Sequence, residues 1–393
     1  MEIITGARLP IYSWAADLET DTLRQARNLG DLEVAVDHAA LMPDAHVGFG
    51  MPIGGVLFTV GAVVPYAIGV DIGCGVQIAQ TDLVWEDSLT PQKLRAVLRQ
   101  IQRDVPTGFA VHKRPPMSLD RLLELVGLDP PGSIARPWLD RALVSVGTLG
   151  GGNHFLEVQR DEENRVYFML HSGSRNLGKQ ICDLFAKRAL QVDRAAGREL
   201  PDPELAYLRV DEDEDAQRYW DSMTFALRWA EVNRRQMMDR VEAAFRKHAS
   251  VHRFERLVDV HHNYAALEEH GGVSGIVHRK GAVQARAGET VLIPGSMGTA
   301  SYIGEGLGNP DAFETCQHGA GRALGRNAAK RAKTSAQVFE EMAALGIEFI
   351  SNEPRTAAEE APFAYKDIES VMALSADLVR PVTRLRPLGV VKG

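Results

Sequence analysis

The sequence predicts an α+β fold, a single large domain over residues 1–393 with mixed β-sheets around a deep cleft and a helical insertion. Three observations support this prediction. Short apolar runs alternate with glycine-dense clusters, one long polar segment carries apolar residues at helical spacing, and no repeat or low-complexity tract divides the chain. With 393 residues, of which 45% are hydrophobic, the chain can bury a large core.

The predicted strands are apolar runs rich in Val, Ile, Leu and aromatic residues, which favour the extended conformation. They lie at 56–64, 165–170, 256–260 and 290–293.

Between these runs, glycine, asparagine and histidine gather in eight clusters. Glycine lets a backbone approach a ligand closely, so one cluster predicts a turn, whereas eight predict loops that converge on one cavity. The clusters occupy residues 42–55, 68–75, 147–155, 171–179, 261–264, 278–282, 293–302 and 317–326.

Two segments are expected to be helical. Residues 213–248 are polar with apolar side chains at helical spacing, and the proline breaks and acids before them are typical of a helix start. Together with a leading loop at Arg194–Asp202, they form the predicted insertion of about 194–250. The second helical segment, 320–345, directly follows the last glycine cluster.

Composition restricts the class of protein. The net charge of −8 counts against a general nucleic-acid binder but allows a local cationic pocket. The N-terminus lacks the features of a signal peptide, and no run approaches the roughly 20 apolar residues of a membrane span. Three cysteines favour a reducing compartment, so we expect a cytoplasmic protein without a membrane partner.

Five side chains inside the glycine clusters predict a divalent-metal site. Asp71 and Cys74 are three residues apart in GVDIGCG, and His154, His171 and His262 each follow an apolar or glycine-rich stretch. This mixture of oxygen, nitrogen and sulfur donors fits a transition ion such as Mn²⁺, Zn²⁺ or Co²⁺ better than Mg²⁺ or Ca²⁺. The alternative is that Cys74 is a buried apolar residue and each histidine a hydrogen-bonded core residue.

Other clusters have the composition of phosphate sites. HSGSRNLGK combines Ser172, Ser174 and Arg175 with an expected helix start near Leu177, and the 293–302 loop offers further hydroxyls.

In QHGAGRALGR, Arg322 and Arg326 are expected on one helical face, which Lys330 extends. A solvated helix face is the ordinary alternative. His318 would lie near the start of that helix, where a nucleophilic histidine can form a phosphoramidate. Neither a Walker A loop nor a Rossmann fingerprint occurs.

The order of these motifs resembles the RtcB family, the GTP-dependent 3′-phosphate RNA ligases. The shared blocks are MPDAHVGFGMPIGG, GVDIGCG, GTLGGGNHF, HSGSRNLG, HHN, HRKGA, IPGSMGTASY, HGAGR and the terminal VKG, from Met42 to Gly393. The resemblance implies an RtcB-type catalytic domain around an active-site cleft. It also implies an enzyme that joins RNA 3′-phosphate or 2′,3′-cyclic phosphate ends to 5′-hydroxyl ends, in RNA repair or tRNA splicing.

The resemblance also implies roles for individual residues. Two Mn²⁺ ions would share Cys74; one would also bind His171 and His262, and the other Asp71 and His154. His318 would be the catalytic nucleophile that carries GMP and passes it to the RNA as an activated 3′-pp-5′-G end. Guanylate would contact Asn153, Phe155, Glu157, His262, Asn263, Pro294, Gly295, Ser296, Met297, Ser301, His318, Gly319, Ala320, Gly321, Tyr365 and Lys392. RNA phosphates would contact Arg175, Lys280, Arg322 and Arg326. Gln317 stands where the family pattern leads us to expect a small polar residue.

The implied cofactors are therefore Mn²⁺ and GTP, and the implied partners are RNA ends. A monomer is expected, and an activating protein is compatible with the sequence. Two alternatives stay open at this point. The first is a metal-dependent phosphoesterase acting on cyclic phosphates or nucleotides, and the second is a non-catalytic protein that binds RNA ends or metal. His318 and Lys392 favour the ligase, because a hydrolase needs neither a guanylylated histidine nor a guanine pocket.

Overall fold

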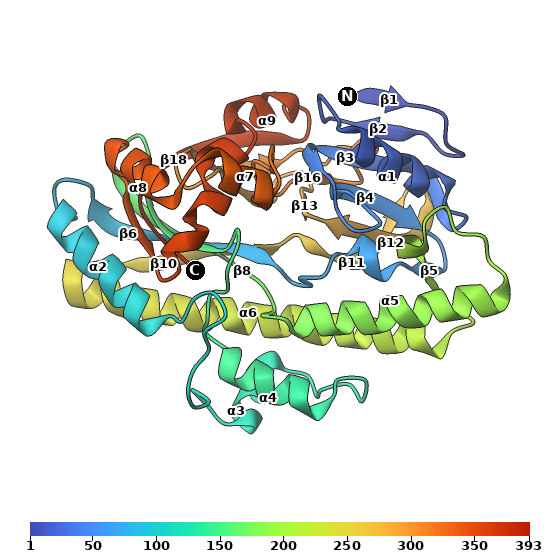
Figure 1. Ribbon diagram of the computed structural model, residues 1–393, viewed down its shortest axis with the longest axis horizontal. Coiled ribbons are helices and arrows are strands. Elements are labelled where there is room, and N and C mark those ends of the chain that lie inside the picture. The colour runs from blue at the N-terminus through green and yellow to red at the C-terminus, as the bar shows by residue number, and fades with distance from the viewer.

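The computed structural model describes residues 1–393, which form two large β-sheets, two short strand pairs and nine α-helices (Figure 1). The six-stranded sheet is antiparallel except between its second and third strands. In spatial order its strands are β1 (Glu2–Ile4), β2 (Ile11–Ser13), β3 (Ala35–His46), β4 (Ile53–Thr59), β12 (Val273–Lys280) and β11 (Asn263–His270).

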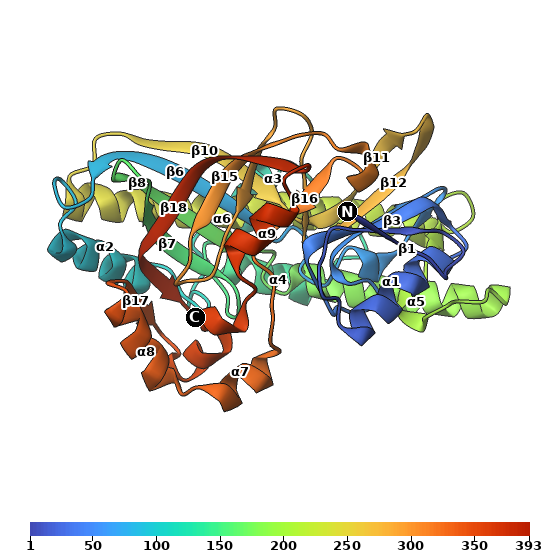
Figure 2. The same cartoon turned by 90° about the horizontal axis from the view of Figure 1, so that it is seen from above.

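The second sheet has eight strands, and only β17 (Glu348–Ser351), which pairs with β18, runs parallel to its neighbour. Its other strands, in spatial order, are β10 (Phe254–His261), β6 (Gly75–Val84), β8 (Arg165–Ser172), β7 (Phe155–Arg160), β18 (Val379–Lys392), β15 (Ser301–Gly306) and β14 (Thr290–Ile293). Two short pairs are separate, β5 (Ala62–Val63) with β9 (Leu208–Arg209) and β13 (Ala282–Gln284) with β16 (Thr315–Gln317). Seen from above, the two sheets lie next to each other with β16 between them (Figure 2).

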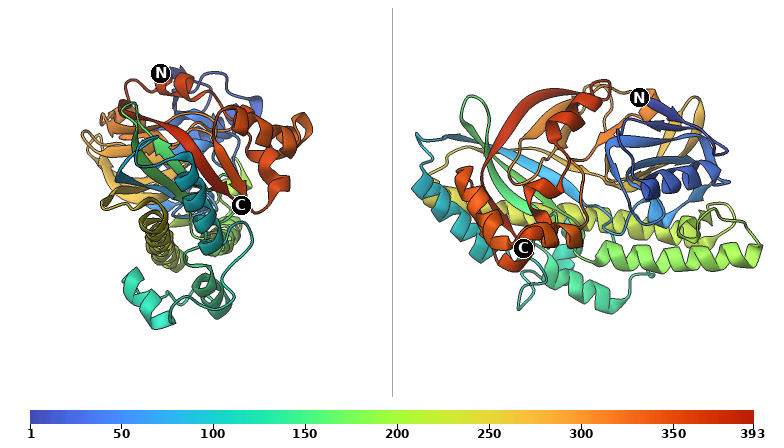
Figure 3. Two further views of the ribbon diagram at one scale, coloured as in Figure 1. Left: turned by 90° about the vertical axis from the view of Figure 1, so that its left-hand side faces the viewer. Right: turned by 45° about the horizontal axis from the view of Figure 1, so that its top comes forward.

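Helices flank the sheets on more than one side (Figure 1). The two longest, α5 and α6, run side by side beneath both sheets, with α3 and α4 below them (Figures 1 and 3). The α-helices are α1 (Thr20–Asp31), α2 (Pro91–Asp104), α3 (Leu119–Val126), α4 (Arg136–Ser145), α5 (Leu177–Ala196), α6 (Glu214–Ala249), α7 (Arg326–Ala332), α8 (Ser335–Ala344) and α9 (Ile368–Leu374). Short 3₁₀ turns occupy η1 (Pro65–Ala67), η2 (Pro203–Leu205), η3 (Pro310–Ala312), η4 (Pro354–Glu360) and η5 (Pro362–Ala364). No helix combines the length and the apolar character that crossing a membrane requires.

Most predicted elements are confirmed. All four apolar runs form strands, although 56–64 is divided between β4 and β5 by a turn in which Gly61 has φ +66°. The long predicted helix is α6, with Glu214 and Asp215 in its first turn and basic residues in its last, as the helix dipole favours. The helix start expected near Leu177 is the first residue of α5.

Two expectations about helix boundaries are wrong. The leading loop does not begin at Arg194, because α5 continues to Ala196 and ends where Gly197 turns left-handed at φ +67°. In place of the helix expected over 320–345 there are two helices, α7 and α8, and the first begins only at Arg326. Gly321, at φ +70°, has a left-handed conformation that a helix cannot continue through. Arg322 pairs instead with Tyr365 in an isolated β-bridge. Arg322 and Arg326 therefore do not share a helical face, and His318 does not adjoin a helix start.

Candidate active site

A cavity of about 520 Å³ opens where strands of both sheets end. The six-stranded sheet contributes Asn263 and Lys280, and the eight-stranded sheet contributes His171, Glu157 and Lys392. Loops supply the remaining walls. The predicted residues that line it are Asp71, Cys74, Asn153, Phe155, Glu157, His171, His262, Asn263, Lys280, Pro294, Gly295, Ser296, Met297, His318, Gly319, Ala320, Gly321, Arg322, Arg326, Tyr365 and Lys392.

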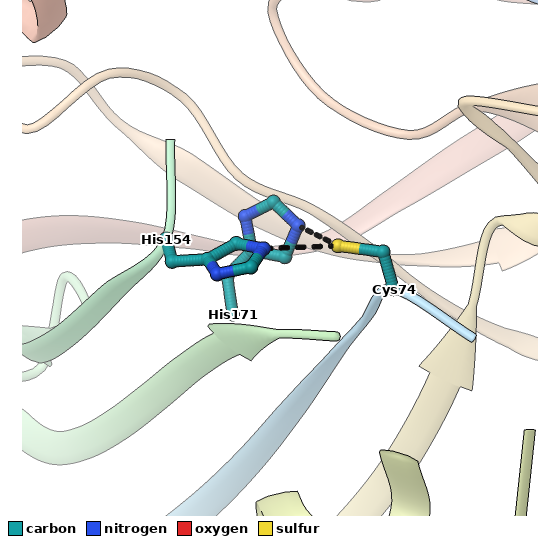
Figure 4. A group of neighbouring side chains, drawn as sticks. All are labelled: Cys74, His154 and His171. Atoms are coloured by element: carbon teal, nitrogen blue, oxygen red, sulfur yellow. Dashed lines mark hydrogen bonds between the residues drawn. The ribbon is translucent and has the colours of Figure 1, made fainter. Parts of the chain in front are cut away.

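Four of the five predicted metal ligands line one end of this cavity, and the fifth, His154, contacts two of them, Cys74 and Asp71. The Cys74 Sγ is 3.4 Å from Nε2 of His154 and 3.2 Å from Nε2 of His171, and these three donors converge in Figure 4. On one side, Asp71 Oδ2 is 3.1 Å from the His154 Nε2. On the other, His262 Nε2 is 3.4 Å from the His171 Nε2. The donors thus form a row with the thiol at its centre.

Hydrogen bonds on the far side of two rings orient these donors. The Nδ1 of His154 is 2.9 Å from the Leu149 carbonyl, and the Nδ1 of His171 is 3.3 Å from the Asn153 carbonyl. A carbonyl can only accept, so Nδ1 carries the proton and Nε2 keeps its lone pair for an electrophile. The donor set therefore suits a divalent transition ion.

Burial keeps two of the histidines, His171 and His262, neutral. It holds the pKa of His171 and of His262 well below 6.5, with the neighbouring histidines adding to the effect. Burial opposes ionisation of Asp71, but the hydrogen bond and charge of His154 and the Ser174 backbone N–H outweigh it and lower the Asp71 pKa to about 2. Burial and the Asp71 charge raise the pKa of the Cys74 thiol well above 9. A bound cation would be needed to favour its thiolate.

Two adjacent residues of α6 hold the ligand-bearing loops in place. Arg234, fully buried, donates to the Gly73 carbonyl at 2.7 Å and the Ser172 carbonyl at 3.1 Å, and pairs with Asp259 at 2.7 Å. Asn233 accepts from the backbone N–H of Gly147 at 2.7 Å. The long helix thereby connects the loops that precede or follow Cys74, His154 and His171.

His318 lies next to the metal-ligand row and contacts a carboxylate. Its ring centroid is 4.8 Å from that of His262. Its Nδ1 is 2.7 Å from Oδ2 of Asp44, a fully buried carboxylate whose oxygens accept no hydrogen bond, so the two groups form an ion pair without hydrogen-bond geometry. The charge of this carboxylate favours the tautomer with the proton on Nδ1, which leaves the Nε2 lone pair available as a nucleophile.

Glycine makes room for this pair. A Cβ on Gly281, which has φ +60°, would lie 3.1 Å from the His318 ring, and one on Gly321 would lie 2.3 Å from the Asp44 carbonyl oxygen. The packing of the glycine clusters against each other thus brings His318 and Asp44 together.

The other end of the cavity is cationic and is organised by Glu360. This buried carboxylate lies 3.2 Å from Arg322, 3.3 Å from Arg326 and 4.0 Å from Lys392, and it accepts from the Tyr365 hydroxyl. Burial opposes ionisation of Glu360, but the Lys392 and Arg322 charges outweigh it and lower its pKa. The Arg322 guanidinium also lies 5.2 Å from the centre of the Tyr365 ring.

Between the two ends lie polar groups that fit a nucleotide. Burial raises the pKa of Glu157 from 4.5 to about 7, although Gln159 donates to the carboxylate at 2.6 Å and Lys392 lies nearby. Gln159 also donates to Ser301 at 3.1 Å. Ser296 belongs to a loop whose Pro294 carbonyl accepts from the Ala320 N–H at 3.1 Å, so this loop is joined to the His318 loop.

Some predicted contacts occupy other positions. Ser301 is buried behind the cavity wall, and both ends of the Asn263 amide bind backbone groups of Asp71 and Gly281. The Lys280 ammonium is not presented to a ligand, because it donates to the Phe49, Met51 and Tyr66 carbonyls. Arg175 lies outside the cavity, in a neighbouring one with Arg141.

Sequence reasoning missed Asp44 and Glu360. Asp44 lies in the first glycine cluster and was detectable there as an acidic residue in the same context as the metal ligands. Glu360 is the last residue of the 3₁₀ turn η4, in an Ala- and Glu-rich stretch, and carries no comparable signal.

Comparison with known proteins matches this chain over its length. The sequence model of the family described as tRNA-splicing ligase RtcB matches residues 25–130 and 126–393. The RNA-splicing ligase RtcB of Escherichia coli strain K12 is 35% identical, over 100% of this chain and 99% of that protein. The tRNA-splicing ligase RtcB of Pyrobaculum aerophilum is 37% identical, over 95% of this chain and 91% of that protein. The RNA-splicing ligase RtcB of Mycobacterium tuberculosis is 35% identical, over 94% and 100% respectively.

Proposed function

The chain belongs to the RtcB family, and from that premise we propose that it is a GTP-dependent RNA ligase. It joins RNA ends bearing a 3′-phosphate to 5′-hydroxyl ends, and it takes 2′,3′-cyclic phosphates after water has opened them. The observation that carries the proposal is the His318–Asp44 distance of 2.7 Å, since His318 lines the same cavity as four of the five candidate metal ligands. A simple phosphoesterase requires only the metal ligands and no such histidine.

The nucleotide reaction takes place at His318. Asp44 keeps the Nδ1 proton in place while Nε2 forms a bond to the α-phosphorus of GTP and the bond to the β-phosphate oxygen breaks. Pyrophosphate leaves, and GMP remains on the ring. Glu157, Ser296 and Lys392 line the part of the cavity where the nucleotide would lie, with Tyr365 beside it.

Two transfers to RNA follow. An oxygen of the RNA 3′-phosphate attacks the phosphorus of GMP, the bond to His318 breaks, and a 3′-pp-5′-G end forms. The 5′-hydroxyl oxygen of the second strand then attacks the RNA phosphate, GMP leaves, and a phosphodiester remains. Arg322 and Arg326 are the cavity residues with the charge to hold the phosphates, and Arg175 is the candidate outside it.

Cys74 is proposed to bridge two Mn²⁺ ions, one held also by His171 and His262 and the other by Asp71 and His154. The positive charge of the ions would offset the repulsion between the phosphates of GTP and of the RNA end. The order of donors along the row supports this division, because the Cys74 Sγ lies between the Asp71–His154 pair and the His171–His262 pair. We expect a cytoplasmic monomer, with an activating protein as a further candidate partner.

The direct test is incubation with Mn²⁺ and GTP labelled at the α-phosphate, followed by a denaturing gel. We expect an acid-labile, alkali-stable adduct that is absent from His318→Ala and retained in His248→Ala, a histidine at the far end of α6. Hydrolysis of cyclic ends to phosphomonoesters without any adduct, across a series of divalent ions, would instead establish the phosphoesterase.

A further inference from the structure

The carboxylate that faces His318 lies in an irregular part of β3. The pairing of β3 with β4 stops at Leu41 and resumes at His46, and the four residues between them face only Gly54 of β4. An interruption of this kind turns side chains away from the regular alternation of a strand and leaves backbone groups without ladder partners. A Cβ on Gly54 would lie 2.9 Å from Oδ1 of Asp44, so this glycine makes room for the carboxylate. The bulged segment therefore directs Asp44 toward His318, and other groups must hold it there.

Side chains bind three successive carbonyls of this buried segment. The Lys366 ammonium donates to the Pro43 carbonyl at 3.2 Å and to the Ala45 carbonyl at 2.7 Å. The Asp44 carbonyl between them accepts from Nδ1 of His46 at 3.0 Å. Because a buried carbonyl without a donor costs free energy, these contacts fix the backbone on both sides of Asp44.

The backbone of Lys366 contacts the loop that carries the other member of the pair. Its N–H donates to the Gly321 carbonyl at 3.0 Å, and Gly321 belongs to the same loop as His318. The Lys366 side chain does not line the 520 Å³ cavity. Lys366 is therefore placed to act on both His318 and Asp44 without touching a ligand.

The charge of Lys366 also suits this position. Asp44 is fully buried and its oxygens accept no hydrogen bond, and a buried carboxylate charge is costly unless an opposite charge lies nearby. The ammonium, held at the carbonyls on both sides of Asp44, supplies that charge. Burial lowers the pKa of Lys366, and the negative charges of Asp44, Glu19 and Asp17 oppose this effect. An uncharged side chain of the same length would fill the space but would supply neither donors nor charge.

We propose that Lys366 is a positioning residue for guanylylation, which fixes the bulged segment of β3 so that the Asp44 carboxylate stays against Nδ1 of His318. The inference rests on the proposed ligase function, because it concerns the step in which His318 attacks GTP. Its effect passes through Asp44, and Lys366 itself contacts neither the nucleotide nor the metal.

The test is the single-turnover rate of adduct formation from Mn²⁺ and labelled GTP. Lys366→Met should slow the step about tenfold at saturating GTP, because it removes the donors that hold Asp44 in place. The GTP concentration that gives half the maximal rate should stay within about twofold, since Lys366 does not line the cavity. Lys366 is only partly buried, so the variant should stay folded.

Two further variants serve as comparisons. Lys366→Arg keeps donors for both carbonyls and should stay within about threefold of the wild-type rate. Lys93→Met is the matched control and should leave the rate unchanged. The Lys93 ammonium also donates to a carbonyl, that of Ser88, but it belongs to α2, away from the cavity.

The Asp44→Asn background separates positioning from a general loosening of the fold. If Lys366 acts through Asp44, adding Lys366→Met to Asp44→Asn should slow the step by no more than about twofold further. A further tenfold loss in that background would overturn the inference. Equal losses in Lys366→Met and Lys366→Arg would also overturn it.

The wild-type protein distinguishes failure of this inference from failure of the proposed function. A wild type that forms no adduct would contradict the proposed function. An adduct that forms at the same rate in the wild type and in Lys366→Met would contradict only the role of Lys366.

Discussion

The two ends of the central cavity are organised in opposite ways. At the metal-binding end, neutral imidazoles are oriented by backbone carbonyls, such as that of Leu149 behind His154. At the cationic end, Arg322 and Lys392 both pair with the Glu360 carboxylate. The first end keeps its geometry when a donor is lost, whereas the second depends on a single charge. Substitutions at the two ends should therefore have different consequences, the first for activity and the second for stability.

The largest effect is expected at the centre of the metal-ligand row. Cys74→Ala should abolish both Mn²⁺ binding and guanylylation while the protein stays folded, because the thiol lies between His154 on one side and His171 on the other. Metal content after dialysis against Mn²⁺, measured by mass spectrometry, checks the first result. Cys182→Ala, at a buried cysteine of α5, is the control and should keep its metal. Undiminished metal in Cys74→Ala would refute the bridging role.

At the cationic end, Glu360→Ala should reduce the free energy of unfolding by about 3 kcal/mol, because it leaves buried Lys392 and partly buried Arg322 without this counter-charge. Urea denaturation measures the loss. The matched control is Glu359→Ala. The Glu359 carboxylate pairs with half-exposed Lys330 and Arg326, so its loss should lower the free energy of unfolding by no more than about 1 kcal/mol. Similar losses for the two variants would contradict the central position of Glu360.

Between the two ends, Glu157 should make stability depend on pH. Its pKa of about 7 in the folded protein exceeds its ordinary 4.5, so its favourable contribution is complete below pH 4.5 and is lost as pH rises through 7. The difference corresponds to at most about 3 kcal/mol. Glu157→Gln, which cannot ionise, should remove this dependence in unfolding curves recorded without GTP. The same pH profile in the variant and the wild type would show that another group causes it.

A smaller effect is expected where orientation alone is changed. Asp44→Asn should slow guanylylation about 10- to 100-fold, since the amide no longer fixes the Nδ1 proton of His318. Bound metal should be unchanged, which separates this variant from Cys74→Ala. A wild-type rate of adduct formation, measured in a single turnover, would remove Asp44 from the account.

The sequence predicted what depends on local pattern. Apolar runs identified β4, β8, β10 and β14, and helical spacing identified α6. Glycine context singled out five metal-ligand candidates that lie close together in space, although they are up to 191 positions apart, from Asp71 to His262; their binding of metal stays a prediction. Strand β18 was missed, because prolines and arginines interrupt its apolar pattern until Leu388.

What the sequence could not supply was the partner of each polar side chain. Spacing placed Arg322 and Arg326 on one helix, but the positive φ of Gly321 prevents a helix there and α7 begins only at Arg326. Lys280 has the composition of a phosphate contact, yet three carbonyls occupy its ammonium. The Asp44–His318 contact joins residues on different elements, the strand β3 and the loop after β16, and only the tertiary fold brings them together.

The most direct test of the two-ended site follows labelled GMP from His318 to RNA. Protein carrying the labelled adduct, freed of GTP, is mixed with an RNA strand ending in a 3′-phosphate and then with a 5′-hydroxyl strand. We predict that the label leaves the protein, appears on the 3′-phosphate strand, and is released as GMP in equal amount to the joined RNA. Label that stays on the protein, or leaves as GMP without passing to RNA, would contradict the account.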